Sequence, residues 1–176
     1  YQVAAVLAIL SRGCSYVPID ETFPTKIIEH CVILSSATIC LTDNKNQDKV
    51  QCISGVRIIN VEALDYTDGS DAQLVLTTPE EELAIIFTSG TTGMPKGIRL
   101  KQIGVLNAVK FTNERYQVGI NDRVLALTNL CHDMSMYDIF GMFVAGGTIV
   151  IPEKEGARDP QHWMKIMKKY QVTIFN

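Results

Sequence analysis

Residues 83–98 join an apolar strand pattern to a loop whose residue types can bind phosphate. The stretch reads Leu-Ala-Ile-Ile-Phe-Thr-Ser-Gly-Thr-Thr-Gly-Met-Pro-Lys-Gly-Ile. Glycines tolerate the positive φ angles that let successive backbone N–H groups converge on an anion. Hydroxyl groups add donors, a lysine adds a compact positive charge, and each charge-assisted hydrogen bond is worth roughly 1.5–3 kcal/mol. The residues predicted to bind phosphate are Thr88, Ser89, Gly90, Thr91, Thr92, Gly93 and Lys96.

This loop differs from a Walker A loop at the residues on either side of its lysine. A Walker A loop needs a glycine before the lysine and a serine or threonine after it, whose hydroxyl binds magnesium. Here Pro95 precedes Lys96 and Gly97 follows it. Residues 97–100 are predicted to form a strand, so backbone amides, hydroxyls and Lys96 must hold the anion without help from a helix dipole. The alternative interpretation is an ordinary hairpin turn rich in glycine and threonine.

Apolar patterns with helical and strand periods alternate along the chain, which is typical of an α/β fold. The predicted helices are 2–12, a segment opened by Pro24 with Ile27, Cys31 and Leu34 on one face, 102–116, 134–145 and 160–169. The predicted strands are 38–41, 57–61, 83–88, 97–100, 123–128, 148–152 and 172–175. A polar stretch, 43–49, lies between the first two of these strands, and the acidic stretch 65–82 is predicted to be a connecting loop.

Three motifs in the same order resemble the AMP-forming adenylating enzymes. The loop Thr-Ser-Gly-Thr-Thr-Gly-Met-Pro-Lys-Gly is similar to the signature of this group, which includes acyl-CoA synthetases, luciferases and the adenylation domains of nonribosomal peptide synthetases. Residues 5–20, which end in Tyr-Val-Pro-Ile-Asp, and residues 132–140, His-Asp-Met-Ser-Met-Tyr-Asp-Ile-Phe, are similar to two further peptide synthetase segments. The resemblance implies that residues 1–176 are a partial adenylation domain. It would be a middle slice of the large N-terminal subdomain, without the mobile C-terminal subdomain.

Asp133 stands directly before an apolar helical pattern. Its carboxylate can cap the helix by accepting backbone N–H bonds of the first turn. In the peptide synthetases that the chain resembles, the matching aspartate instead binds the α-ammonium group of the amino acid. Met134 and Tyr137 match positions that line the substrate pocket, and their alternative role is plain core packing. Since enzymes that activate acids without an amine have no use for this charge, Asp133 favours an amino acid substrate. The segment that begins with Asp133 is similar to adenylation domains that supply cysteine to thiazoline-forming synthetases, and this resemblance implies cysteine as the amino acid.

The resemblance implies a reaction in two steps. The amino acid carboxylate attacks the α-phosphate of Mg-ATP, forms aminoacyl-AMP and releases pyrophosphate. The acyl group then passes to the phosphopantetheine thiol of a peptidyl carrier domain in the same or a partner polypeptide. Lys96 is the candidate catalytic residue, and the loop would hold the β- and γ-phosphates. Motifs that supply Mg²⁺ ligands and the C-terminal lysine are missing, so the isolated chain is expected to be inactive. Alternatives are an acyl- or aryl-acid CoA ligase and a non-catalytic nucleotide-binding module.

Composition argues against several other classes of function. The net charge is −3, from 16 basic and 19 acidic residues, and no basic stripe is present to bind nucleic acid or anionic lipid. The apolar runs are too short to span a bilayer. The five cysteines and three histidines have no metal-ligand or disulfide spacing. We therefore expect a cytoplasmic enzyme with no metal ligands of its own, cut from a longer polypeptide because the chain begins and ends inside predicted elements.

Overall fold

The computed structural model of the protein describes residues 1–67, 73–89, 93–153 and 156–175. The chain divides into two compact units, 1–101 and 102–176, which are described separately below. Helices and strands alternate in both units, which confirms the predicted α/β class. Within the described residues, no helix has the length and apolar character needed to cross a membrane.

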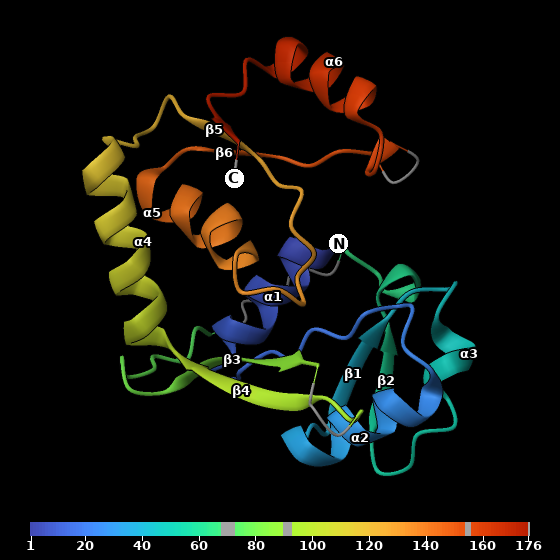
Figure 1. Ribbon diagram of the computed structural model, residues 1–176. Helices are drawn as coiled ribbons and strands as arrows, with labels where there is room; N and C mark the ends of the chain where they lie inside the picture. The colour runs from blue at the N-terminus through green and yellow to red at the C-terminus, as the bar shows by residue number, and fades with distance from the viewer. Residues whose placement is uncertain (68–72, 90–92, 154–155, 176) are drawn as a thin grey trace. The chain divides into compact units, whose positions relative to one another are not determined.

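The first unit contains two pairs of strands. Strands β1 and β2 are parallel, while β3 and β4 form an antiparallel hairpin (Figure 1). Tyr16 extends the hairpin by one parallel bridge to Ala84. The elements of this unit are α1 (Gln2–Ser11), α2 (Thr25–Ser35), β1 (Ile39–Thr42), α3 (Gln47–Val50), β2 (Arg57–Asn60), the 3-10 turn η1 (Val61–Ala63), β3 (Glu82–Thr88) and β4 (Lys96–Lys101).

Helix α2 packs on one face of the β3–β4 hairpin. Cys31 of α2 is fully buried in a cluster with Ile85 and Phe87 of β3. On the neighbouring strand, a Cβ atom at Gly97 would lie only 3.3 Å from the Phe87 ring. A side chain at the glycine after Lys96 would therefore be in tight contact with the side chains of Ile85 and Phe87.

The buried face of α2 differs from the predicted one. Ile28 and Cys31 are buried, whereas Leu34 is 49% exposed. Ile28 packs with Val50 and Ile53, beside the β1–β2 pair. The prediction took account of the helical period alone, and the presence of a second apolar cluster next to α2 changed which residues face inward.

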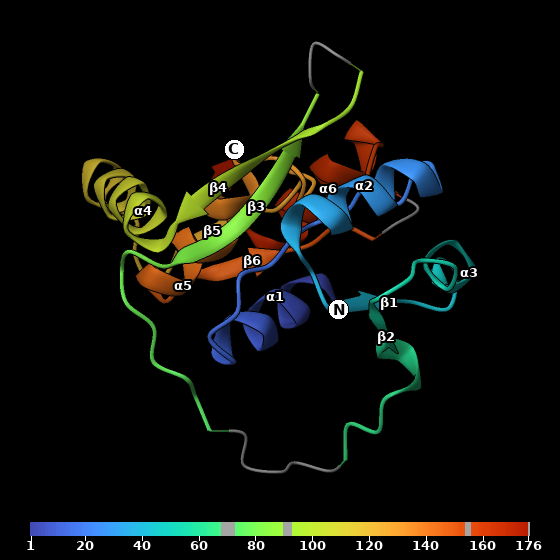
Figure 2. The same ribbon diagram turned by 90° about the horizontal axis from the view of Figure 1, so that it is seen from below.

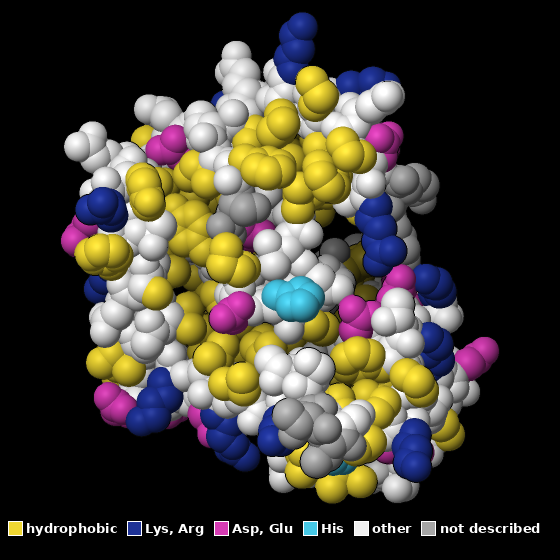
Figure 3. All heavy atoms as spheres, viewed as in Figure 1, with side chains coloured by type: hydrophobic (Ala, Val, Ile, Leu, Met, Phe, Trp, Pro, Cys, Tyr) yellow, Lys and Arg dark blue, Asp and Glu magenta, His cyan; other side chains and the backbone are white. Residues whose placement is uncertain are grey.

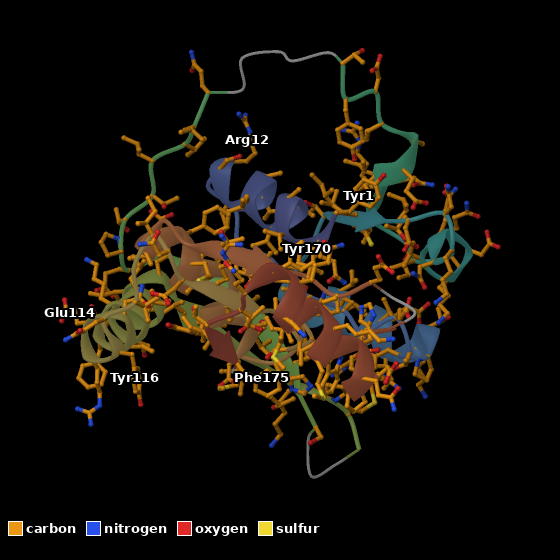
Figure 4. All side chains as sticks on the ribbon, turned by 90° about the horizontal axis from the view of Figure 1, so that it is seen from above. Tyr1, Arg12, Glu114, Tyr116, Tyr170 and Phe175 are labelled. Carbon is orange, nitrogen blue, oxygen red and sulfur yellow. The ribbon has the colours of Figure 1, made fainter. Side chains whose placement is uncertain are left out.

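The connection after β2 returns along the end of α1. Arg12 donates a hydrogen bond from Nη1 to the backbone oxygen of Gln73 at 2.9 Å, and Val75 N donates to Ser11 O at 2.9 Å (Figure 4). Gly13 ends the helix with a φ of 70°, and a Cβ there would lie 2.7 Å from Val75. The absence of a side chain at Gly13 therefore allows this close approach.

The second unit is built on a parallel sheet with the order β6-β5-β7. Its elements are α4 (Gln102–Tyr116), β5 (Arg123–Leu125), the π-helical turn η2 (Tyr137–Gly141), α5 (Met142–Ala145), β6 (Thr148–Val150), α6 (Pro160–Tyr170) and β7 (Ile174–Phe175). Leu125, Val150 and Ile166 form a buried cluster between the sheet and α6. Hydrophobic side chains also gather on the surface below α6 (Figure 3), and Phe175 at the end of β7 is 59% exposed.

Several elements of the second unit differ from their predicted bounds; the strands predicted at 148–152 and 172–175, for example, are Thr148–Val150 and Ile174–Phe175. The strand predicted at 123–128 ends at Leu125. The helix predicted at 134–145 is present, but residues 137–141 within it form a π-helical turn. A π-helical turn is usually a single wide turn inside an α-helix, often at a functional site. The apolar period predicted a helix here, and both ends of the wider turn form hydrogen bonds with Asn113 of α4, which are described below.

Candidate active site

The hairpin of the first unit places a hydroxyl and a cation opposite each other. Thr88, the last residue of β3, pairs with Lys96, the first residue of β4. Residues directly opposite in an antiparallel pair have Cβ atoms roughly 4.5–5.5 Å apart and point to the same face. Both side chains are exposed, so both are available at the two ends of the connecting loop. The predicted strand after the loop is confirmed.

Lys96 differs from the other two cations of β4. Arg99 forms an ion pair with Glu82 at 2.5 Å, and Lys101 forms one with Glu80 at 2.8 Å. In the part of the chain that the structure describes, no carboxylate pairs with the Lys96 ammonium group. Of the three cations on β4, Lys96 is thus the one without an ion pair to the described residues, and it is available to an anionic ligand.

The loop itself is described only at its ends. Gly90, Thr91 and Thr92 lie outside the described residues. Ser89 is exposed, and Gly93 has a φ of 82° in the left-handed region that favours glycine. A Cβ at Gly93 would meet nothing within 4 Å, so backbone conformation rather than close packing calls for glycine there. Hydroxyls, a left-handed glycine and an unpaired lysine fit a phosphate group.

A histidine from α2 contacts the loop just before Lys96. His30 Nε2 lies 3.0 Å from the backbone oxygen of Pro95. Because a carbonyl oxygen can only accept, the histidine must donate from Nε2. Figure 2 shows α2 running beside the loop end of the hairpin. The sequence analysis missed His30, since nothing in the local pattern connects it with a loop so far along the chain.

Asp133 lies at the start of the helical segment of the second unit, with an exposed side chain. Its backbone oxygen accepts a hydrogen bond from Met136 N at 3.0 Å. Its carboxylate forms no hydrogen bond or ion pair with the described residues, and no side chain caps the following π-helical turn. The alternative role as a helix cap therefore finds no support in the geometry, and the charge is left available to a ligand.

Tyr137, at the start of η2, is held by contacts with two other residues. Its hydroxyl donates to Asn113 Oδ1 of α4 at 3.0 Å, and Asn113 Nδ2 donates to the backbone oxygen of Gly141 at 3.0 Å. A Cβ at Gly141 would come within 2.9 Å of the Tyr137 ring. Burial, and after it the charges of Asp122 and Asp138, raise the pKa of Tyr137, so its hydroxyl remains a neutral donor.

Comparison with known proteins identifies the family. The model of the family described as AMP-binding enzyme matches residues 1–176. The chain belongs to the AMP-binding enzyme family. The polyketide synthase PksN of Bacillus subtilis (strain 168) and the pyochelin synthetase PchF of Pseudomonas aeruginosa are each 34% identical to it over 99% of its length. The chain spans 3% of the length of PksN and 10% of that of PchF.

Solved structures of AMP-binding enzymes share this fold. The nonribosomal peptide synthetase FmoA3, with α-methyl-L-serine-AMP bound, matches with a TM-score of 0.85 at 32% identity, over 98% of this chain and 19% of that one. A fatty acyl-adenylate ligase from L. pneumophila matches with a TM-score of 0.84 at 21% identity, over 99% of this chain and 32% of that one. The predicted resemblance to peptide synthetase adenylation domains and the predicted N-terminal subdomain fragment are confirmed.

In this member of the AMP-binding enzyme family, the predicted site residues fall into two sets. Thr88, Ser89, Gly93 and Lys96 belong to the first unit. Asp133, Met134 and Tyr137 belong to the second unit and come from one helical segment. Asp133 and Met134 are exposed, Met134 at 53%, while Tyr137 is half-buried. Their roles in binding remain predictions.

Asp138 is a further charged residue of this segment that the sequence analysis did not single out. It is only 2% exposed, and its Oδ2 accepts a hydrogen bond from Thr128 N at 3.4 Å. This hydrogen bond joins the segment that follows β5 to η2. Among the residues that the structure describes, no group of three or more His, Cys, Asp or Glu side chains could hold a metal ion.

Proposed function

We propose that this chain is part of an enzyme that activates an amino acid as aminoacyl-AMP, with release of pyrophosphate, for nonribosomal peptide synthesis. In this reaction an amino acid carboxylate oxygen forms a bond to the α-phosphorus of ATP, and the bond from that phosphorus to pyrophosphate breaks. Both reactants are anionic, so positioning and charge stabilisation dominate the catalysis.

The observation that carries the proposal is the free carboxylate of Asp133. An exposed aspartate without a partner among the described residues can pair with the α-ammonium group of an amino acid. When substrate binding excludes water, removing one partner of such a pair costs about 3–5 kcal/mol. An acid without an amine would leave this charge unpaired, which favours an amino acid over an acyl or aryl acid.

The ATP side of the proposal rests on the hairpin loop. The residues Thr88, Ser89, Gly93 and Lys96, together with 90–92, would bind the β- and γ-phosphates. The lack of a carboxylate partner for Lys96 among the described residues supports this role, as does the structure of FmoA3 in a form with AMPPNP bound. Mg²⁺ would neutralise phosphate charge when bound, and its protein ligands would come from outside this chain.

The amino acid and the carrier are proposed from the relatives. FmoA3 holds α-methyl-L-serine-AMP in its structure, which supports a small amino acid with a heteroatom on its β-carbon. Cysteine fits this description, and the pattern around Tyr137 favours it. McyG was solved as an A-PCP structure with phenylalanyl-adenylate, which supports transfer to a phosphopantetheine thiol on a carrier domain.

The proposal is tested by ATP–pyrophosphate exchange on the natural polypeptide that contains this chain. The panel contains cysteine, serine, several other amino acids, and fatty and aryl acids without an amine. We expect exchange with one amino acid or a few closely related ones. Exchange only with acids that lack an amine would move the assignment to an acyl ligase. ATP binding without exchange for any acid would indicate a non-catalytic nucleotide-binding module.

A further inference from the structure

Tyr137, which is predicted to line the substrate pocket, is itself in contact with two other residues of the second unit. Its hydroxyl is bonded to Asn113, and its ring lies against Gly141, four residues further along the same helical segment. Asn113 is itself buried, at 8% exposed. Its neighbours in the sequence at the end of α4, Glu114 and Tyr116, point outward (Figure 4), with Tyr116 71% exposed.

The two hydrogen bonds of Asn113 determine the orientation of its amide. The Gly141 backbone oxygen can only accept, so the Nδ2 group must face it, and Oδ1 must then face the Tyr137 hydroxyl. This amide thereby ties both ends of the π-helical turn, Tyr137 and Gly141, to α4. Tyr137 is therefore held at its hydroxyl by Asn113, and its ring packs against Gly141.

We propose that Asn113 is a positioning residue that sets the placement of the Tyr137 ring and, through it, which amino acid side chain the enzyme accepts. This inference rests on the proposed function, in which Tyr137 lines the substrate pocket. A pocket wall discriminates between side chains of similar size only when its own position is constrained by neighbouring groups. Asn113 supplies that constraint for the hydroxyl and Gly141 supplies it for the ring.

The substitutions Asn113→Ala and Gly141→Ala test this from two sides. Asn113→Ala frees the Tyr137 hydroxyl. Gly141→Ala pushes the ring, because its Cβ would lie 2.9–3.1 Å from ring carbons. Gly141 already has helical backbone angles, φ −56° and ψ −49°, so alanine is compatible with the backbone and the ring contact alone is changed.

Matched controls are available on α4. Asn107→Ala removes an exposed asparagine of the same helix. Gly104→Ala adds a Cβ that would meet nothing within 4 Å. We expect both controls to exchange pyrophosphate as the unsubstituted enzyme does, with the same ranking of acids.

The measurement is the KM and kcat of exchange for each acid in the panel, in the natural polypeptide, together with the KM for ATP and the melting temperature. Loss of one neutral hydrogen bond predicts that Asn113→Ala shifts the ratio of kcat/KM between two acids about three- to tenfold. The KM for ATP should stay unchanged. Gly141→Ala should shift the same ratio.

A double-mutant cycle with Tyr137→Phe separates positioning from general stability. Once the hydroxyl is absent, Asn113→Ala should cause no further shift in the ranking of acids, although its effect on melting temperature through Gly141 should remain. An unchanged ranking in Asn113→Ala, with only a lower melting temperature, would overturn the inference. If exchange occurred only with acids lacking an amine, the proposed function would fail, yet a shifted ranking among those acids would still support the role of Asn113.

Discussion

The described ends of the hairpin loop in the first unit and the helical segment of the second unit are held by different contacts. At the loop, one described group proposed to bind phosphate ends β3 and another begins β4, and His30 of α2 donates a hydrogen bond to the Pro95 backbone oxygen. The helical segment presents Tyr137 on a π-helical turn, where Asn113 and Gly141 both restrict the side chain.

This difference matches what each region is proposed to bind. A triphosphate is bound through its charge and its oxygens, which backbone amides, hydroxyls and a long lysine side chain can follow over some range of positions. Choosing one amino acid over another depends on contacts worth about 1–3 kcal/mol per methylene group. These contacts form only when the residues that line the substrate pocket keep their positions. Helices and strands therefore suit the selection of an amino acid better than loops do.

The largest effect is expected for Asp133→Ala, which removes the proposed partner of the amino acid ammonium group. The KM for the amino acid should rise about hundreds- to thousands-fold, while ATP binding stays nearly intact. Exchange kinetics with each substrate varied in turn will measure both values. An equal loss toward ATP and amino acid would show that the two regions do not have separate roles.

Lys96→Ala is expected to produce the reverse pattern. It removes one cation that is unpaired in the described part of the chain, and charge-assisted hydrogen bonds are worth roughly 1.5–3 kcal/mol each. The kcat/KM of exchange for ATP should therefore fall about ten- to a hundredfold, while the ranking of amino acids stays unchanged. Lys101→Ala on the same strand is the control, because that cation is already paired with Glu80. Similar losses in both variants would mean that the position of Lys96 at the loop has no special role.

His30→Phe tests how far the loop depends on its contact from α2. The change keeps a ring of similar shape but removes the donor to Pro95. We expect the KM for ATP to rise about three- to tenfold, as for the loss of a neutral hydrogen bond. His30→Gln retains a donor and should show a smaller change. If the two substitutions behaved alike, the hydrogen bond would not position the loop.

The smallest effect is expected for Asp122→Asn, which tests how the sheet that carries the helical segment is held. Asp122 accepts hydrogen bonds from Gly119 N at 2.8 Å and Thr173 Oγ1 at 2.7 Å, and these bonds, in that order, lower the pKa of its carboxyl group. Because the pKa is lower in the folded than in the unfolded state, the ionised carboxylate stabilises the fold at pH values above the unfolded-state pKa. This stabilisation is lost as the pH falls through the folded-state pKa. Asp122→Asn should therefore lower the melting temperature slightly at pH 7, and the difference should disappear toward pH ~3. A difference that persists in acid would point to lost packing instead.

The Asn113 network sharpens the same comparison. Substitutions at Asn113 and Gly141 should alter the choice of acid without altering ATP use, whereas substitutions at Lys96 and His30 should alter ATP use without altering the choice of acid. If any of these substitutions altered both the choice of acid and the use of ATP, the two regions would act as one functional unit.

Local patterns in the sequence were sufficient for much of the fold and for part of the candidate site. The helix predicted at 102–116 has those bounds in the structure. The strand after Lys96 was predicted from the absence of a helix start and is present as β4. The family motifs identified Lys96, Asp133 and Tyr137 as candidates because their types and spacing are visible along a short stretch of chain.

Tertiary structure alone decided how these residues are held. The contact of His30 with Pro95 joins residues 65 positions apart, and the bonds of Asn113 join it to Tyr137 and Gly141 at separations of 24 and 28. The period of an apolar pattern can predict that a segment is helical, but it carries no information on a partner brought close by folding. The π-helical turn, the exposed Leu34 and the free carboxylate of Asp133 all follow from such partners or from their absence among the described residues. The sequence by itself determined which groups can do chemistry, and packing between distant segments determined which of them are constrained and which remain available.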